Sequence, residues 1–239
     1  IYFMSSLYHA LFFAPLYNSL VLLLNILPFA ATGLVVIILT VLVRLILFPL
    51  SKKAVLTQIR MSSLAPELEA IKEKYKDKPE EQARRTLALY QEKKVNPFSG
   101  IFVIIIQIPI IFALYHIFTG LSEVKPDLLY SFVKVPQEIS TLFLGIFDIS
   151  GKSAVLALLA GLSTYLQFKF SNQNHSKPKG DSFGDNLARS MQVQMKYFFP
   201  VIMFFVSYTT SAVIAIYFIS TNLFSIGQEV FIRRRLPRA

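Results

Sequence analysis

Long apolar runs alternate with polar, charged segments along this chain, and this pattern predicts membrane-spanning helices. A helix needs about 20 mainly apolar residues to cross the hydrocarbon core of a bilayer. Residues 29–50, 98–119 and 153–170 each form such a run, the third being the shortest. A fourth run covers residues 197–232. As one helix it would be about 54 Å long at about 1.5 Å per residue, well beyond a core of about 30 Å.

A polar break at residues 208–211 divides the fourth run near its middle. We therefore predict two short helices joined by a turn, the first beginning near residue 191. The result is an all-α polytopic membrane protein with five transmembrane helices. The expected spans are residues 29–50, 98–119, 153–170, 191–209 and 212–232.

The basic residues predict the orientation of these spans. Lys and Arg number 11 in residues 51–97, 5 in residues 169–196 and 4 after residue 232, but only 3 in residues 120–152, where Asp and Glu number 4. Cytoplasmic loops accumulate Lys and Arg. We therefore expect the N-terminus outside, the C-terminus inside and an extracytoplasmic loop at residues 120–152. A loop at residues 171–190 and a basic tail at residues 233–239 are expected in the cytoplasm.

Residues 1–28 carry no Lys, Arg, Asp or Glu and are rich in aromatic side chains. They lack the basic start of a signal peptide. Two interpretations compete, an amphipathic helix lying in the outer interface and a sixth span. Two asparagines, Asn18 and Asn25, and two prolines, Pro15 and Pro28, favour the interfacial helix.

Residues 51–97 form the only substantial polar segment, and their pattern predicts an antiparallel helical hairpin. Apolar residues recur at helical spacing on both sides of a break at residues 76–79. With 11 basic and 7 acidic residues, the net charge of the segment is 11 − 7 = +4. It either only connects two spans or is a docking surface for anionic lipid, ribosomal RNA or a nascent chain. The candidate contact residues are Lys52, Lys53, Arg60, Lys72, Lys74, Arg84 and Arg85.

Composition supports the membrane assignment and disfavours an enzyme. The 239 residues are 54% hydrophobic and 16% charged, whereas soluble domains are about 25% charged. The absence of Cys removes disulfides, thiolate metal sites and cysteine nucleophiles. The three His residues are dispersed, and no nucleotide-binding or hydrolase motif is present. We expect no metal and no cofactor.

Arg44 lies inside the first predicted span. An arginine at the centre of a bilayer is unfavourable by at least about 2.5–3.5 kcal/mol, so such residues usually face protein or water. Arg44 is six residues from the predicted inner end of its helix, so its side chain could instead extend to the interface. Thr40 lies four residues away on the same helix face and continues a polar stripe into the membrane.

Polar side chains occur in the other predicted spans as well. A single intramembrane glutamine is commonly a helix–helix hydrogen bond. Because polar groups occur on several helices, we favour a shared hydrophilic groove that is open to the cytoplasm. Its candidate residues, besides Arg44 and Thr40, are Gln107, Gln167, Asn222 and Gln228.

Several blocks of the sequence resemble the YidC/Oxa/Alb membrane protein insertases. RLILFPLSK, from Arg44 to Lys52, is similar to the end of their first core span. Leu89-Tyr90 and KVNP at residues 94–97, followed by QIPI and ALY at residues 107–115, resemble the entry and body of the second. FPV at residues 199–201 and STNLFSIGQ at residues 220–228 resemble the last two spans. These blocks, taken in order, extend over nearly the whole chain. They are most similar to the bacterial form of the family.

The resemblance implies an ATP-independent insertase and folding factor in the bacterial plasma membrane. It would act on nascent membrane proteins, alone or with the Sec translocon, and would bind ribosomes transiently. In the family a basic residue in the groove attracts the polar segment of the substrate, and Arg44 occupies that position. Thr40 and Tyr217 align with groove or substrate-contacting positions.

Two other classes of function remain open at this stage. A small solute transporter or channel would need access from both sides, and transporters commonly show internal repeats, which this sequence lacks. A structural membrane scaffold would not explain why the chain places an arginine, Arg44, inside a span.

Overall fold

The computed structural model describes residues 6–28, 31–96, 99–120, 124–136, 139–171, 190 and 193–235. These residues are mostly helical, which confirms the predicted class. Most of the predicted loop at residues 171–190, the end of the predicted tail and residues 191–192 of the predicted fourth span lie outside them.

Three helices are long and apolar enough to cross a membrane within the described residues. They are Ser6–Ile26, Ala154–Ser171 and Ala212–Arg234. A fourth candidate consists of Thr32–Ile46 and Phe48–Ser63, two helices that meet at a bend of 62°. Length and composition thus support three or four spans, and the arrangement of five spans with the N-terminus outside stays a prediction.

The bend divides the first predicted span. Helix α3 (Thr32–Ile46) ends before residue 50, and α4 (Phe48–Ser63) leaves in a new direction. Pro49 stands in the first turn of α4, where it cannot donate to the preceding turn and its ring clashes with the carbonyl four residues earlier. Arg44 therefore lies in the last turn of α3, directly before the bend.

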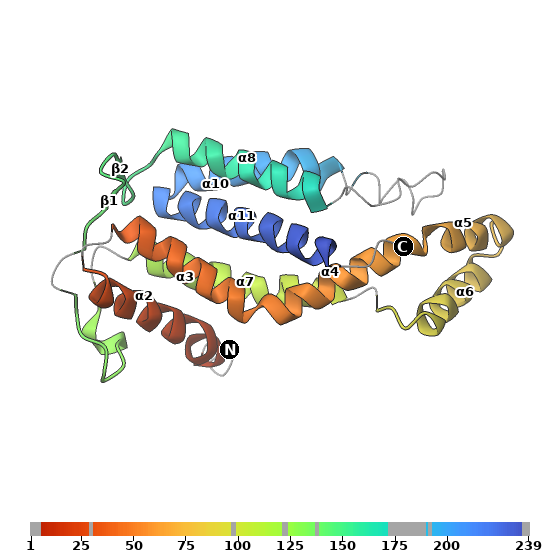
Figure 1. Cartoon of the computed structure of the whole chain (residues 1–239), viewed down its shortest axis with the longest axis horizontal. Coiled ribbons are helices and arrows are strands. Elements are labelled where there is room, and N and C mark those ends of the chain that lie inside the picture. Colours follow the sequence, from red (N-terminus) through yellow and green to blue (C-terminus); the bar gives the residue numbers. More distant parts are fainter. Residues whose placement is uncertain are drawn as a thin grey trace.

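Two further helices, α5 (Ala65–Lys74) and α6 (Pro79–Glu92), form an antiparallel pair beyond α4 at one end of the molecule (Figure 1). Each has a proline in its first turn, where the missing N–H leaves no hydrogen bond unmade. Leu64, Leu89 and Val95 are buried, at the end of the pair opposite its turn, where α5 begins and α6 ends. Glu67 and Lys93 join the two arms at 3.2 Å.

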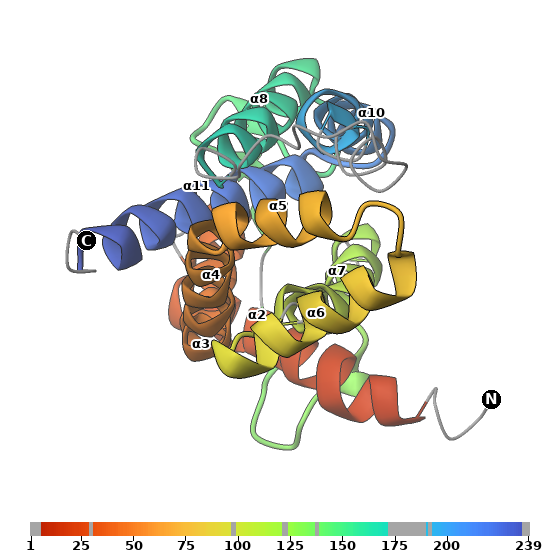
Figure 2. The same ribbon diagram turned by 90° about the vertical axis from the view of Figure 1, so that its right-hand side faces the viewer.

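Helix α11 (Ala212–Arg234) is the centre of the bundle (Figures 1 and 2). It packs against α8 (Ala154–Ser171), α10 (Phe199–Thr209) and α7 (Ser99–Thr119), and also against α3 and α4. The π-helical turn η3 (Gln194–Phe198) leads into α10. At Gly161 the backbones of α8 and α10 approach closely, because an added Cβ would lie 3.0 Å from the carbonyl oxygen of Pro200.

The opposite end carries a short antiparallel hairpin, β1 (Leu142–Phe143) and β2 (Phe147–Asp148). Its flanking backbone accepts hydrogen bonds from the first turns of two helices. The Ala212 N–H donates to the Gly151 carbonyl at 2.8 Å, and the Thr32 N–H donates to the Ser140 carbonyl at 3.2 Å, alongside the Thr32 hydroxyl. Because the first N–H groups of a helix have no partner within it, these bonds fasten the loop to the ends of α3 and α11.

The N-terminal helix runs beside the preceding part of the same loop. It consists of the π-helical turn η1 (His9–Phe13) and α2 (Ala14–Ile26), and the loop contains the 3₁₀ turn η2 (Pro126–Leu128). The Tyr17 hydroxyl accepts from the Lys125 N–H at 2.7 Å, and the Asn25 amide donates to the Lys134 carbonyl at 2.6 Å. These contacts hold the loop against one side of α2.

Asn18 makes the most enclosed of these contacts and provides a stability test. Its buried amide donates to the Leu128 carbonyl at 3.1 Å and accepts from the Tyr130 N–H at 2.7 Å. Asn18→Ala removes both bonds, so we expect a loss of about 1–3 kcal/mol. The measurement is the thermal unfolding midpoint in detergent micelles. Asn25→Ala is the matched control, with a smaller loss expected because its loop contact is exposed to water; equal losses would contradict the assignment.

Candidate functional site

Arg44 is the only Lys or Arg within α3, and it is half-buried beside α11. It lies close enough to Tyr217 of α11 for the two side chains to interact electrostatically. Among the described residues, Arg44 forms no ion pair and no hydrogen bond. A guanidinium has five N–H donors, so Arg44 can donate to a carboxylate or carbonyl group that enters from outside the chain.

Tyr217 connects Arg44 to α7. The Gln107 side-chain amide donates to the Tyr217 hydroxyl at 2.7 Å. Tyr217 is only 4% exposed, and its ring packs between those of Phe118 and Phe218. Tyr217 of α11 thus lies near two other predicted groove residues, Arg44 of α3 and Gln107 of α7.

Thr40 lies one turn before Arg44 and is buried. Its hydroxyl donates to the Val36 carbonyl of the same helix at 2.7 Å. The hydroxyl hydrogen is therefore already engaged, and the remaining capacity of Thr40 is as an acceptor.

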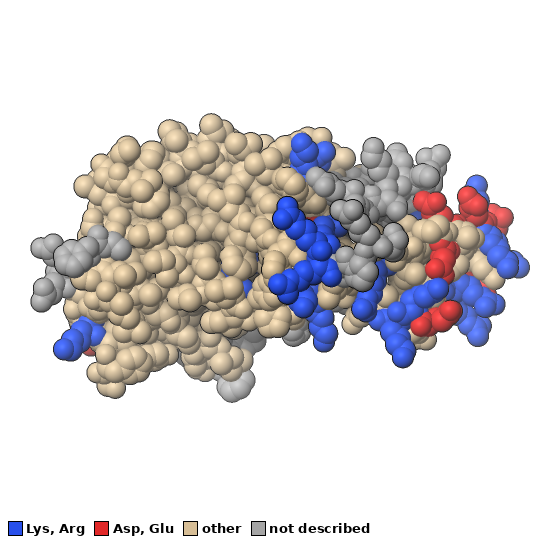
Figure 3. Space-filling view, viewed as in Figure 1, with Lys and Arg blue, Asp and Glu red and all other residues tan. Residues whose placement is uncertain are grey.

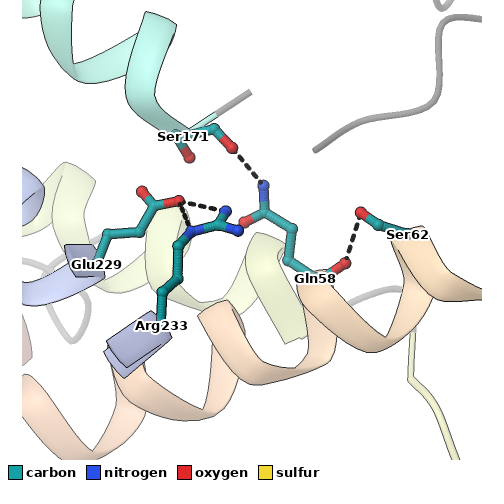
Figure 4. Close-up of polar contacts among 5 residues, drawn as sticks. All are labelled: Gln58, Ser62, Ser171, Glu229 and Arg233. Carbon is teal, nitrogen blue, oxygen red and sulfur yellow. Dashed lines mark hydrogen bonds and ion pairs between the residues drawn. The ribbon is translucent and has the colours of Figure 1, made fainter. Parts of the chain in front are cut away.

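Gln228 is further along α11, on the same helix face as Tyr217 by helical spacing. Its amide donates to the Ser51 hydroxyl of α4 at 2.6 Å. In the next position Glu229 pairs with Arg233 at 2.6 Å, and Figure 4 shows this pair close to Gln58, which donates to the Ser171 carbonyl at 3.5 Å. Polar contacts therefore join α4, α8 and α11 at the end of the bundle nearest α5.

Asn222 points from α11 to α8. Its amide donates to the hydroxyls of Ser163 at 3.0 Å and Thr164 at 2.8 Å, and the residue is 7% exposed. This is the helix–helix hydrogen bond that the sequence left as the alternative for an intramembrane amide. Gln167, one turn later on α8, is half-buried. Neither residue belongs to the Arg44–Tyr217–Gln107 cluster, and their place in a groove stays a prediction.

Two cavities lie between this cluster and the β-hairpin end, and we did not predict them from the sequence. The smaller, of about 50 Å³, is lined by Tyr217 and Phe118. The larger, of about 360 Å³, is lined by Phe118 and by hydroxyl-bearing residues, including Thr210 and Ser211. Phe118 is buried and lines both cavities. The run of hydroxyls at residues 209–211 was the only available sequence signal.

The basic residues of the predicted cytoplasmic hairpin are all exposed. Figure 3 shows Lys and Arg gathered over the end of the molecule that carries α4, α5 and α6, while the rest of that face is almost free of charge. Lys74 and Arg85 both approach the Tyr75 ring, at 5.6 and 5.8 Å from its centroid. Burial raises the pKa of Tyr90, against the opposing effect of nearby Lys72. The seven basic candidates are Lys52, Lys53, Arg60, Lys72, Lys74, Arg84 and Arg85.

Comparison with known proteins identifies the family. Residues 24–239 match the family described as the 60Kd inner membrane protein. The chain belongs to this family. Membership, together with the apolar helices, makes it a multi-pass protein of the bacterial plasma membrane and supports an insertase function.

Individual members of the 60Kd inner membrane protein family that resemble this chain are named membrane protein insertase YidC. The one from Clostridium tetani is 29% identical over 87% of this chain and 84% of its own length. The one from Clostridium perfringens is 32% identical over 82% of this chain and 76% of its own length. The one from Anaeromyxobacter is 34% identical over 86% of this chain, which corresponds to only 33% of that relative.

Proposed function

We propose that this chain inserts nascent membrane proteins through a hydrophilic groove that opens to the cytoplasm, with Arg44 as the residue that receives the polar part of the substrate. The observation that carries the proposal is a half-buried guanidinium with no ion-pair partner among the described residues. Burying an unpaired charge is unfavourable. An acidic or carbonyl-bearing segment that enters the groove removes part of that penalty, so Arg44 attracts it.

The remaining steps follow from the distribution of charge and apolar surface. The exposed basic residues of α4, α5 and α6 attract the acidic flank of a nascent segment and anionic lipid headgroups. The membrane potential favours outward movement of an acidic flank by about 2.3 kcal/mol per charge per 100 mV. The apolar part of the substrate then partitions into lipid, which releases it. No step consumes a nucleotide, and we propose that the chain is not an enzyme.

We further propose five spans with the N-terminus outside, and an interfacial position for residues 1–28. The contacts of Tyr17, Asn18 and Asn25 with loop backbone support this position. An irregular loop alongside a helix inside the hydrocarbon core would expose unsatisfied backbone groups to lipid. In the interface, water and headgroups satisfy them.

The proposed partners are nascent membrane proteins, the ribosome, the Sec translocon and anionic lipids. The exposed basic residues of the hairpin support contacts with ribosomal RNA and lipid. The groove residues we propose are Arg44, Thr40, Gln107 and Tyr217, with Gln167, Asn222 and Gln228 along its walls.

A small solute transporter or channel is the second candidate. It would require the two cavities to join and a path to reach the groove from outside. The two cavities are separate, and the buried Phe118 lines both of them. This separation favours the insertase.

Accessibility from each side of the membrane tests the groove directly. The chain has no Cys, so single cysteines at positions 107, 167 and 221 can be labelled with an impermeant thiol reagent. We expect modification from the cytoplasmic side only. Arg84→Cys and Lys152→Cys, both exposed, serve as controls for the inner and outer sides. Labelling from both sides would indicate a transporter, and no labelling would indicate a structural scaffold.

A further inference from the structure

The outer β-hairpin presents aliphatic side chains on the surface where a soluble hairpin carries polar ones. Side chains alternate between the two faces of a strand. Phe143 and Phe147 point inward and pack against the core. Leu142, Leu144 and Ile146 are 53%, 70% and 76% exposed. The outward side of the hairpin is therefore apolar at its tip, and Asp148, the exposed cross-strand partner of Leu142, is its charged member.

The backbone conformation at the tip of the hairpin is unfavourable for the leucine found there. Leu144 has φ 54° and Gly145 has φ 69°. This left-handed region disfavours residues with a Cβ, and Asn, Asp or Gly usually occupy it in a hairpin turn. Leu144 gains little packing within the described residues, since it is among the most exposed of their large hydrophobic side chains. Strain of this kind commonly marks a functional position.

The position of the hairpin within the bundle is fixed by hydrogen bonds to two helices. It is fastened to the first turns of α3 and α11, and it lies at the end of the bundle opposite α5 and α6 (Figure 1). Helix α8 begins shortly after β2, and one of its faces exposes Val155, Leu158 and Leu162. The apolar tip is therefore adjacent in sequence to a helix with an unpartnered apolar face.

Charged groups flank the tip and limit how deeply it can enter a bilayer. Asp148 is exposed, and its carboxylate accepts hydrogen bonds from the Ser150 N–H and hydroxyl at 3.0 and 2.6 Å. These bonds lower the pKa of Asp148, which keeps it charged. Lys152, four residues later, is exposed as well. Both charged side chains are compatible with the polar headgroup layer of a bilayer.

We propose that Leu142, Leu144 and Ile146 insert into the outer leaflet, at the depth of the glycerol and upper acyl region, and anchor the outer end of the bundle to lipid. A protein partner fits less well, because a specific interface buries about 800 Å² on each side, far more than three aliphatic side chains offer. Lipid requires no such area and continues the apolar surface of α8. The anchor holds the ends of α3 and α11 at a set depth in the membrane.

The chain contains no Trp, so a single introduced tryptophan reports its own surroundings. Ile146→Trp in the full chain, reconstituted in phosphatidylcholine vesicles with bromine near the glycerol or near the chain ends, tests the depth. Because brominated lipid is in both leaflets, the orientation of the protein does not matter. We expect blue-shifted emission that shallow bromines quench more than deep ones. Leu158→Trp should be quenched more by deep bromines, and Glu80→Trp on α6 by neither.

A tryptophan can itself favour the interface, so a second variant is needed. Adding Leu142→Ser and Leu144→Ser to Ile146→Trp removes the remaining apolar tip. We expect quenching by shallow bromines to fall towards the level of Glu80→Trp. Unchanged quenching would mean that the tryptophan alone enters the membrane, which would overturn the proposal. Blue-shifted emission without quenching would indicate a protein partner or a second copy, and red-shifted emission would indicate water; either overturns it as well.

Discussion

Arg44→Glu is expected to reduce the rate of insertion of an acidic-flanked substrate by about tenfold or more in reconstituted vesicles. Two charges about 4 Å apart interact by about 4 kcal/mol at an effective dielectric of about 20, and each 1.4 kcal/mol corresponds to about tenfold. Reversing the charge of Arg44 converts that attraction into repulsion. Arg44→Lys keeps the charge but loses the planar fork of donors, so we expect it to retain most of the activity.

Two comparisons separate an electrostatic role of Arg44 from a structural one. Lys152→Glu makes the same change of net charge at an exposed position of the predicted extracytoplasmic loop, and insertion should proceed normally. A substrate with a neutral polar flank should lose less activity with Arg44→Glu than the acidic one does. Equal activity of Arg44→Lys and Arg44→Glu, with both proteins folded, would refute the electrostatic role.

Gly33→Ala is expected to destabilise the end of the bundle that carries the β-hairpin, with a loss of about 1–3 kcal/mol, as found for overpacked sites. Gly33 stands in the first turn of α3, and an added Cβ would lie 2.7 Å from Cγ of Phe143. This atom is close to the backbone of β1, so the ring cannot turn aside without moving the hairpin. The thermal unfolding midpoint in detergent micelles measures the effect.

A control and a rescue accompany the Gly33 variant. Gly227→Ala, within α11, meets nothing within 4 Å. It should be neutral or stabilise by up to about 1 kcal/mol, because Ala has the higher helix propensity. On a Phe143→Ala background, Gly33→Ala should lose less stability than on the native background. Equal losses on both backgrounds would show that the contact with Phe143 is not responsible.

The predicted helix ends coincide with residues that disfavour helix locally. Pro79 begins α6 after a break, and α10 ends at Thr209 within the predicted polar break. These features depend on the chemistry of a few consecutive residues, which is visible in any single sequence. The bend at Leu47 was harder to predict from the sequence, although the sequence contains Pro49 next to it. A proline shows where a helix can turn, whereas the packing of α4 against α7 and α11 decides how far.

Periodicity was less informative about the site. It placed Arg44 and Thr40 on one face of a helix, but it did not show which neighbour that face meets. Gln107 and Tyr217 are 110 positions apart, and Gln228 and Ser51 are 177 apart. Contacts over such separations follow from the order in which helices pack. For the same reason Asn222 could not be assigned to α8 rather than to the groove from its position in α11.

The sequence by itself determined that this is a helical membrane protein, which segments are apolar, where the basic residues gather and that one arginine lies among apolar residues. Each of these is a local property of composition or spacing. Only the tertiary structure decided that Arg44 lies near Tyr217, that Asn222 donates hydrogen bonds to Ser163 and Thr164, and that the β-hairpin exposes aliphatic side chains. Those outcomes depend on which surfaces the packed helices cover, because burial and partnership are properties of the assembled bundle.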